Sequence, residues 1–189
     1  MKTILLLLVS LFISISFADE SADFTSTLGA YGELHWKTET QKMDFHRLVV
    51  FLGHTWDNQW SFKSEIKFEH NQGNSDQGIA EVDQAYINYD SGSWGFKGGV
   101  LLAPVGIINP YHEPPTFLSV ERPGYAQEIT GAAWVGNGFS FYGNIGNIEL
   151  GCTMLEDLDG QKILDNKSIK DNQSGTATDI LGTKIFNIS

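Results

Sequence analysis

Apolar and polar residues alternate with a period of two along much of the chain. Between Trp60 and His70, aromatic and aliphatic residues occupy one parity and charged residues occupy the other. That period is typical of a β-strand with one apolar and one polar face. The pattern predicts strands at Phe24–Trp36, Met43–Trp56, Trp60–His70, Ala80–Asp90, Trp94–Leu102, Gly131–Gly143, Ile148–Leu155 and Thr176–Ile188. We therefore expect an all-β, antiparallel, up-and-down fold with about eight strands.

The connections between these predicted strands alternate between short turns and longer loops. Asp57–Gln59 and Ser91–Ser93 are short, whereas 71–78 is longer and rich in Gly, Asn and Asp. The turn of the next pair is expected at Asn144–Asn147, with Asn137-Gly138 as the alternative. Alternating short and long connections are typical of outer-membrane barrels. A soluble sandwich also pairs one apolar face with one polar face, so the period alone fits both architectures.

Three tryptophans, Trp56, Trp60 and Trp94, lie at or beside the short turns. In a membrane protein this position predicts an interfacial aromatic belt. In a soluble protein the same residues would be core aromatics.

All five prolines of the chain lie between Ala103 and Pro123, where the alternation stops. Proline cannot donate a backbone hydrogen bond to a sheet, so this segment is predicted to be a loop, which we extend over 103–130. It is unusually apolar for a solvated loop, with Ile107, Ile108, Tyr111, Phe117, Leu118 and Val120. Long loops in compact domains are usually functional. We expect this one to fold inward against the wall of a wide barrel.

The N-terminus has the pattern of a cleaved secretory signal over residues 1–18, which leaves 19–189 as one barrel domain. Removing Lys2 with the signal changes the formal charge from −11 to −12, and so strongly acidic a chain is a poor nucleic-acid binder. Cys152 is the single cysteine, which excludes an intrachain disulfide. We expect export to the outer membrane of a Gram-negative cell.

The sequence offers little that predicts an enzyme. His112-Glu113 is an acid–base pair among apolar residues and would be a candidate general acid or base in a soluble protein. The alternative is structural, with Glu113 pairing with Arg122 or Arg47 to fix the loop. The five histidines are scattered without metal-ligand spacing, and no nucleotide-binding motif is present. No catalytic residue, metal site or cofactor is predicted.

Charged side chains on the polar strand faces would line the lumen if the sheet closes into a barrel. Rings of such charges at a constriction set ion selectivity. His46 and Glu33 could add to the charges that line the lumen. The predicted pore-lining and constriction residues are Arg47, Lys63, Glu65, Lys67, Glu69, His112, Glu113 and Arg122.

Three short motifs in the loop carry a resemblance to a known family. They are Pro-Val-Gly-Ile-Ile-Asn at 104–109, His-Glu-Pro-Pro-Thr-Phe at 112–117 and Val-Glu-Arg-Pro at 120–123. Together they resemble the constriction loop of bacterial outer-membrane porins related to the phosphate-selective O and P porins. The similarity extends to 43–56 and more weakly over 28–141. The resemblance implies a passive ion and solute channel in contact with outer-membrane lipid, homotrimeric in full-length form. Only Arg47 and Arg122 are arginines, so phosphate selectivity is not carried over.

The length of the chain conflicts with a complete pore. Aqueous porin channels need about 16–18 strands, whereas about eight strands leave room only for side chains. We therefore expect the chain to be the N-terminal part of a longer porin. The alternatives are a small structural eight-stranded outer-membrane barrel and a secreted soluble β-sandwich that acts as an enzyme or carbohydrate-binding protein.

Overall fold

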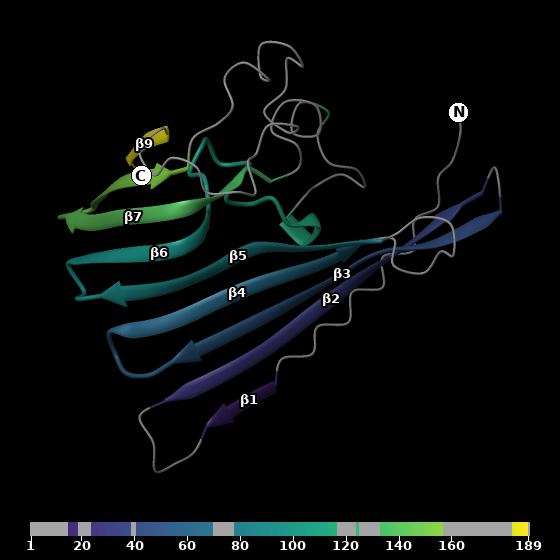
Figure 1. Cartoon of the computed structure of the whole chain (residues 1–189), viewed down its shortest axis with the longest axis horizontal. Helices are drawn as coiled ribbons and strands as arrows, with labels where there is room; N and C mark the ends of the chain where they lie inside the picture. Colours follow the sequence, from purple (N-terminus) through teal and green to yellow (C-terminus); the bar gives the residue numbers. More distant parts are fainter. Residues whose placement is uncertain are drawn as a thin grey trace. The chain divides into compact units, whose positions relative to one another are not determined.

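The computed structural model describes residues 15–18, 24–38, 41–69, 78–116, 124, 133–156 and 183–188. These residues belong to two compact units: unit 1 comprises residues 1–57 and 61–82, and unit 2 comprises 58–60 and 83–189. The described regular elements are strands, apart from the short 3-10 turn η1 at Pro114–Thr116 (Figure 1). The strands are β1 Ile15–Ala18, β2 Thr25–Lys37, β3 Lys42–Thr55, β4 Trp60–Glu69, β5 Ile79–Asp90, β6 Trp94–Leu102, β7 Val135–Ile145, β8 Ile148–Leu155 and β9 Thr183–Ile188.

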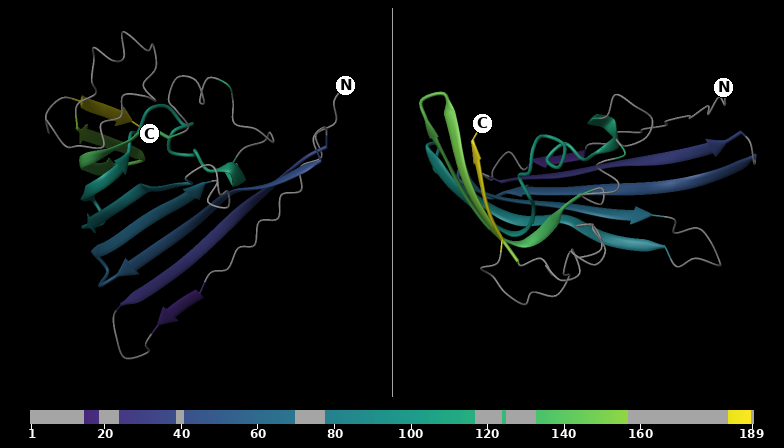
Figure 2. Two further views of the ribbon diagram at one scale, coloured as in Figure 1. Left: turned by 45° about the vertical axis from the view of Figure 1, so that its right-hand side comes forward. Right: turned by 90° about the horizontal axis from the view of Figure 1, so that it is seen from above.

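In unit 1, β1, β2, β3 and β4 pair antiparallel, each with the next strand in sequence. β2 and β3 form a long hairpin whose two arms run side by side in every view (Figure 2). Its register changes once, between the pairs Glu33↔Arg47 and Leu34↔Phe45. His46 is therefore the extra residue of a β-bulge, which turns a side chain toward a face that simple alternation would not give it.

In unit 2, β5 to β9 also pair antiparallel, each with the next strand in sequence. The β5–β6 turn uses Gly92 at φ 90°, with its N–H donating to Asp90 Oδ1 at 2.7 Å. The β7–β8 turn contains Gly146 at φ 65° between the paired residues Ile145 and Ile148. The alternative turn at Asn137-Gly138 is therefore wrong, because both residues lie within β7 and pair with β6.

The polarity of the unit 1 strands is inverted relative to a soluble protein. The pairs Arg47↔Glu69, Val49↔Lys67 and Phe51↔Glu65 put the charged residues of β3 and β4 on one face. That face is largely buried apart from Lys63, and Glu65 on it is only 2% exposed. The opposite face is apolar yet open, and Leu52 on it is 40% exposed. Burial here favours the polar face over the apolar one.

Unit 2 shows the same inversion in part, although Leu101 and Leu155 are buried on the same face as Thr153. Thr153, on its polar face, is 2% exposed, whereas Phe141 on its apolar face is 50% exposed. Other exposed apolar residues on that face are Ile87, Phe139, Ile145, Ile148 and Leu150. The buried apolar cluster is small and consists of Leu101, Ala103, Trp134 and Leu155, with Tyr86 packed against it.

The predicted all-β antiparallel fold is confirmed in the described residues. The bounds of β6 and β8 match the predicted strands, and most other ends differ by one or two residues. β7 begins at Val135, four residues later than predicted, and Gly131 and Ala132 lie outside the described part. β1 overlaps the end of the predicted signal, whose residues 1–14 are also outside it. In the described residues, no helix is long and apolar enough to cross a membrane.

Candidate functional site

An ion-pair chain crosses three strands on the buried face of unit 1. The register places Glu33 of β2 opposite Arg47 of β3, and Arg47 opposite Glu69 of β4. Arg47 Nη2 lies 2.6 Å from Glu69 Oε1, and Arg47 Nε lies 3.9 Å from Glu33 Oε2. The three side chains are largely buried, so their interactions are less screened than those of surface pairs. The guanidinium of Arg47 thus lies between two carboxylates and partly neutralises both.

The row of charges on β4 pairs across strands rather than along its own strand. Lys67 Nζ lies 2.9 Å from Glu81 Oε2 on the first residues of β5, which also belong to unit 1. Lys63 is exposed on the same strand face, and Glu65 is buried there. The structure therefore brings the predicted residues Arg47, Lys63, Glu65, Lys67 and Glu69 to one face. Their role in lining a pore stays a prediction.

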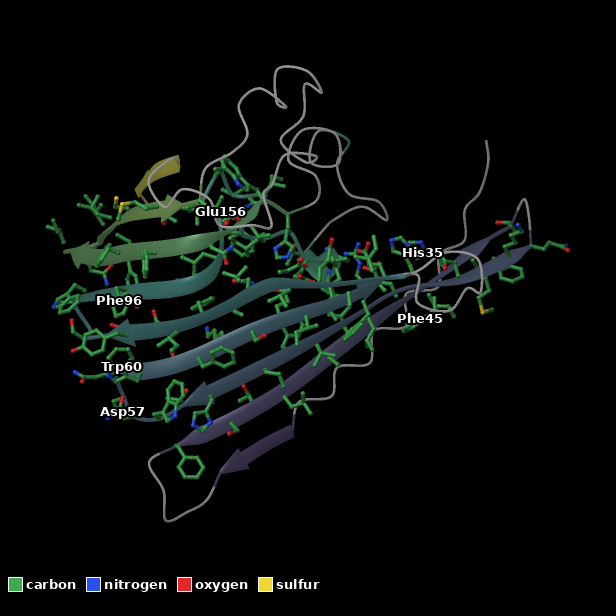
Figure 3. The ribbon with its side chains drawn as sticks, in the orientation of Figure 1. His35, Phe45, Asp57, Trp60, Phe96 and Glu156 are labelled. Atoms are coloured by element: carbon green, nitrogen blue, oxygen red, sulfur yellow. The ribbon has the colours of Figure 1, made fainter. Side chains whose placement is uncertain are left out.

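The bulge at His46 assembles a second group of titratable side chains beside Arg47. The imidazole rings of His35 and His46 stack with centroids 4.2 Å apart and an interplanar angle of 14°. His35 Nε2 lies 3.6 Å from Glu33 Oε2, and His46 Nδ1 lies 3.5 Å from Asp44 Oδ2. Figure 3 shows His35 and Phe45 on opposite sides of the β2–β3 hairpin, in agreement with their register. Two imidazoles and a carboxylate therefore share one face.

The long loop of unit 2 is closed at its base by one buried side chain. Asn109 Nδ2 donates to Ala103 O at 2.7 Å and to Trp134 O at 2.9 Å. The Trp134 N–H donates to Asn109 Oδ1 at 2.7 Å, and the Ala103 N–H donates to Trp134 O at 2.9 Å. Both Asn109 and Trp134 are buried. The side-chain amide thus continues the sheet's hydrogen bonding between the two ends of the loop.

Further along the loop, His112 is buried and its Nε2 lies 3.0 Å from Glu113 Oε1. η1 follows, and Thr116 Oγ1 lies 2.7 Å from Tyr111 O and 2.6 Å from Glu113 O, which share its one hydroxyl hydrogen. This tight turn is stabilised by side-chain to backbone bonds that proline cannot supply. Residues 103–116 form no strand, as predicted, and Arg122 lies outside the described residues.

Aromatic residues line the short-turn end of the unit 2 strands, around the labelled residues Trp60 and Phe96 (Figure 3). Trp60 lies 4.9 Å from Tyr89 and 6.1 Å from Phe96, between ring centroids. Tyr89 in turn lies 5.3 Å from Trp94. Trp60 and Trp94 remain substantially exposed, so they do not form a closed core. Their role as an interfacial belt stays a prediction.

Sequence reasoning missed two features of this arrangement. Asn109 was a polar residue within an apolar loop, and that contrast was the available signal for a buried hydrogen-bonding role. The spacing of the histidines does not predict the His35–His46 group, because it does not resemble a metal motif. Residues far apart in sequence meet when strands pair, and the bulge that aligns them leaves no mark in a period-two pattern.

Comparisons with known proteins give one similar sequence. A protein of Aquifex aeolicus (strain VF5), itself uncharacterised, is 38% identical over 126 residues, which cover 62% of this chain and 29% of that protein. The chain thus spans less than a third of the relative's length. No family model matches the chain. No solved structure matches it either.

Proposed function

We propose that the chain forms part of the wall of an outer-membrane, porin-like channel that admits small solutes or ions by passive diffusion. The proposal includes a closed barrel of 16–18 strands in the longer protein, with the loop at 103–130 folded inward. It includes no covalent step and no cofactor. The loop motifs that resemble porins support it, as does the much greater length of the similar Aquifex protein.

The observation that carries the proposal is the inverted polarity of the strands, seen separately in each unit. Glu65 and Thr153 are buried, whereas Leu52 and Phe141 are 40% and 50% exposed. Soluble proteins rarely expose contiguous apolar patches of this kind without a partner. In an outer-membrane barrel, apolar residues face lipid and polar residues face the lumen, so this polarity is expected.

In the proposed channel, the polar face would supply the charges along the solute path. Arg47, Lys63 and Lys67 contribute positive charge, and Glu65 and Glu69 contribute negative charge. His112, Glu113 and Arg122 would add the loop's contribution at the constriction. A wall with both signs favours passage of small polar solutes of either charge over strong selectivity for anions.

A depth series on one strand tests the membrane placement. Phe139, Phe141 and Ile145 all lie on the exposed apolar face of β7, at increasing proximity to the β7–β8 turn. We expect Phe139→Arg to destabilise the bilayer-inserted protein by about 2–4 kcal/mol and Ile145→Arg by about 0–1 kcal/mol, because the cost of arginine depends on depth. Urea titration in lipid vesicles measures both, with Phe141→Arg expected between them.

Two further measurements separate the proposal from its rivals. The exported protein should be recovered with outer membranes and should need detergent to stay in solution. Recovery as a monodisperse protein in plain buffer, with no depth gradient along β7, would support the soluble β-sandwich. Single-channel current in planar bilayers then distinguishes a channel from a small structural barrel, because only the channel conducts.

A further inference from the structure

We infer that Glu33, His35 and His46 form a binding site for a divalent transition-metal ion on the polar face of the β2–β3 hairpin. Each residue offers one ligand atom, and the three atoms lie within 4.8 Å of one another. All three residues belong to unit 1. The inference concerns this hairpin alone and does not depend on whether the protein conducts solutes.

The donor set defines the class of ion. Imidazole nitrogen suits Zn²⁺, Cu²⁺, Ni²⁺ and Fe²⁺, whereas Mg²⁺ and Ca²⁺ prefer oxygen ligands. Two histidines and one carboxylate leave a coordination position open for water or another small ligand. The separation of 3.6 Å between His35 Nε2 and Glu33 Oε2 is close to the ~3.4 Å edge of a tetrahedral site with ~2.1 Å bonds.

Glu33 supplies independent support for a missing cation. Glu33 is 5% exposed, and its Oε1 atom is buried without a hydrogen-bond partner in the described part of the chain. Buried carboxylate oxygens normally have partners, because leaving one unsatisfied costs about 1–3 kcal/mol. Arg47 does not remove this need, since its Nε is 3.9 Å from the other oxygen and its Nη2 is engaged with Glu69. A metal ion held by both carboxylate oxygens, with Oε2 on the side of His35, would satisfy Oε1.

The local charge also favours a cation. Glu33, Asp44 and Glu69 contribute carboxylates around the site, against the one guanidinium of Arg47. Asp44, which lies 3.5 Å from His46 Nδ1, can orient that ring as an outer partner. His46 is the more accessible of the two imidazoles, so it offers the route by which an ion enters.

Binding requires one local adjustment. The two rings are nearly parallel, and the in-plane nitrogen lone pairs of parallel rings do not converge on one point. Rotation of one ring about its broad χ2 torsion would direct both nitrogens at a single ion. Metal binding should therefore disrupt the stack, which gives a readout separate from affinity.

The test is Zn²⁺ titration of the purified chain in detergent, by calorimetry, with Cu²⁺ used for a spectroscopic signature of nitrogen ligation. We expect one Zn²⁺ per chain, with affinity reduced at least tenfold in each of Glu33→Gln, His35→Gln and His46→Gln. The matched control is His54→Gln. His54 is also on β3, but its Nδ1 lies 2.8 Å from Ser26 Oγ, away from the cluster. The Zn²⁺ affinity of His54→Gln should therefore equal that of the wild type.

Two outcomes would overturn the inference. One is no Zn²⁺ binding at micromolar concentration by the folded wild-type chain. The other is binding that survives His46→Gln and Glu33→Gln, or that is lost equally in His54→Gln, because it would then lie elsewhere. Glu33→Gln keeps the shape of the side chain, so a loss of affinity with an unchanged circular dichroism spectrum reports ligation rather than unfolding. Failure of this test leaves the depth series on β7 unaffected.

Discussion

The two units differ in the contacts that their polar faces make. In unit 1 the buried groups are ionic, as in the contact of Arg47 with Glu69. In unit 2 the carboxylates of Asp83 and Glu156 are buried too, but several contacts on the polar face join neutral groups. The Ser140 and Thr153 hydroxyls lie 2.8 Å apart, and Tyr142 O–H donates to Asn88 Oδ1 at 2.8 Å. The cation on that face, Lys97, lies over the rings of Tyr86 and Tyr142 at 5.6 and 5.2 Å.

This difference determines how each face should respond to mutation. Removing one member of a buried ion pair leaves an uncompensated charge, which is costly. Removing one member of a neutral pair costs the desolvation of a single polar group, which is smaller. The ion pairs of unit 1 should also respond to salt and to metal ions, whereas the neutral contacts of unit 2 should be indifferent to both.

The largest effect is expected for Arg47→Met. The substitution leaves Glu33 and Glu69 buried without their shared cation, and breaking such a pair costs about 3 kcal/mol. Urea unfolding in detergent, followed by tryptophan fluorescence, measures the loss. The matched control is Lys63→Met, an exposed cation on the same strand face as Glu69, which should stay within about 0.5 kcal/mol of wild type.

The double variant Arg47→Met with Glu69→Leu separates the lost ion pair from lost packing. If uncompensated charge is the cause, the second substitution should restore at least about 1 kcal/mol, because an apolar pair replaces a stranded carboxylate. A double variant whose loss equals the sum of the losses in Arg47→Met and Glu69→Leu measured singly would show that the ionic description of this face is wrong.

Asn109→Ala is the corresponding break in the neutral region. It removes three hydrogen bonds and leaves the Trp134 N–H buried without its acceptor. We expect a loss of about 2 kcal/mol, and proteolysis within the loop at lower protease concentration, because the base of the loop is no longer closed. Asn144→Ala, at an exposed position of β7 beside the β7–β8 turn, is the control and should leave both measurements unchanged. Equal resistance of the loop to protease in wild type and Asn109→Ala would show that Asn109 does not close the base of the loop.

The sequence predicted what depends on local alternation and missed what depends on pairing across strands. The alternating charges of β4 predict that strand. The alternation that predicts β6 ends at Leu102, two residues before Pro104. The partner of Lys67 was not predicted, because Glu81 is brought to it by the fold and not by spacing. His46 was assigned to the polar face only as a candidate, since strict alternation places it with Leu48. The bulge decides its side, and bulges follow from the competition between two registers that a single strand does not reveal.

The smallest effect is expected for Lys67→Met, which tests the comparison within unit 1 itself. Lys67 and Glu81 are 2.9 Å apart, closer than Arg47 Nε and Glu33 Oε2, so distance alone would predict a strong contribution. The Glu81 side chain, however, is 49% exposed, and an exposed partner keeps most of its hydration when the lysine is removed. The loss should therefore stay below about 1 kcal/mol. Raising the salt concentration to about 1 M, where the Debye length is ~3 Å, should remove most of that difference. The same salt should leave most of the stability loss of Arg47→Met, because Glu33 and Glu69 remain buried and unpaired in that variant. A Lys67→Met loss as large and as salt-resistant as that of Arg47→Met would mean that burial does not rank the ion pairs of this face.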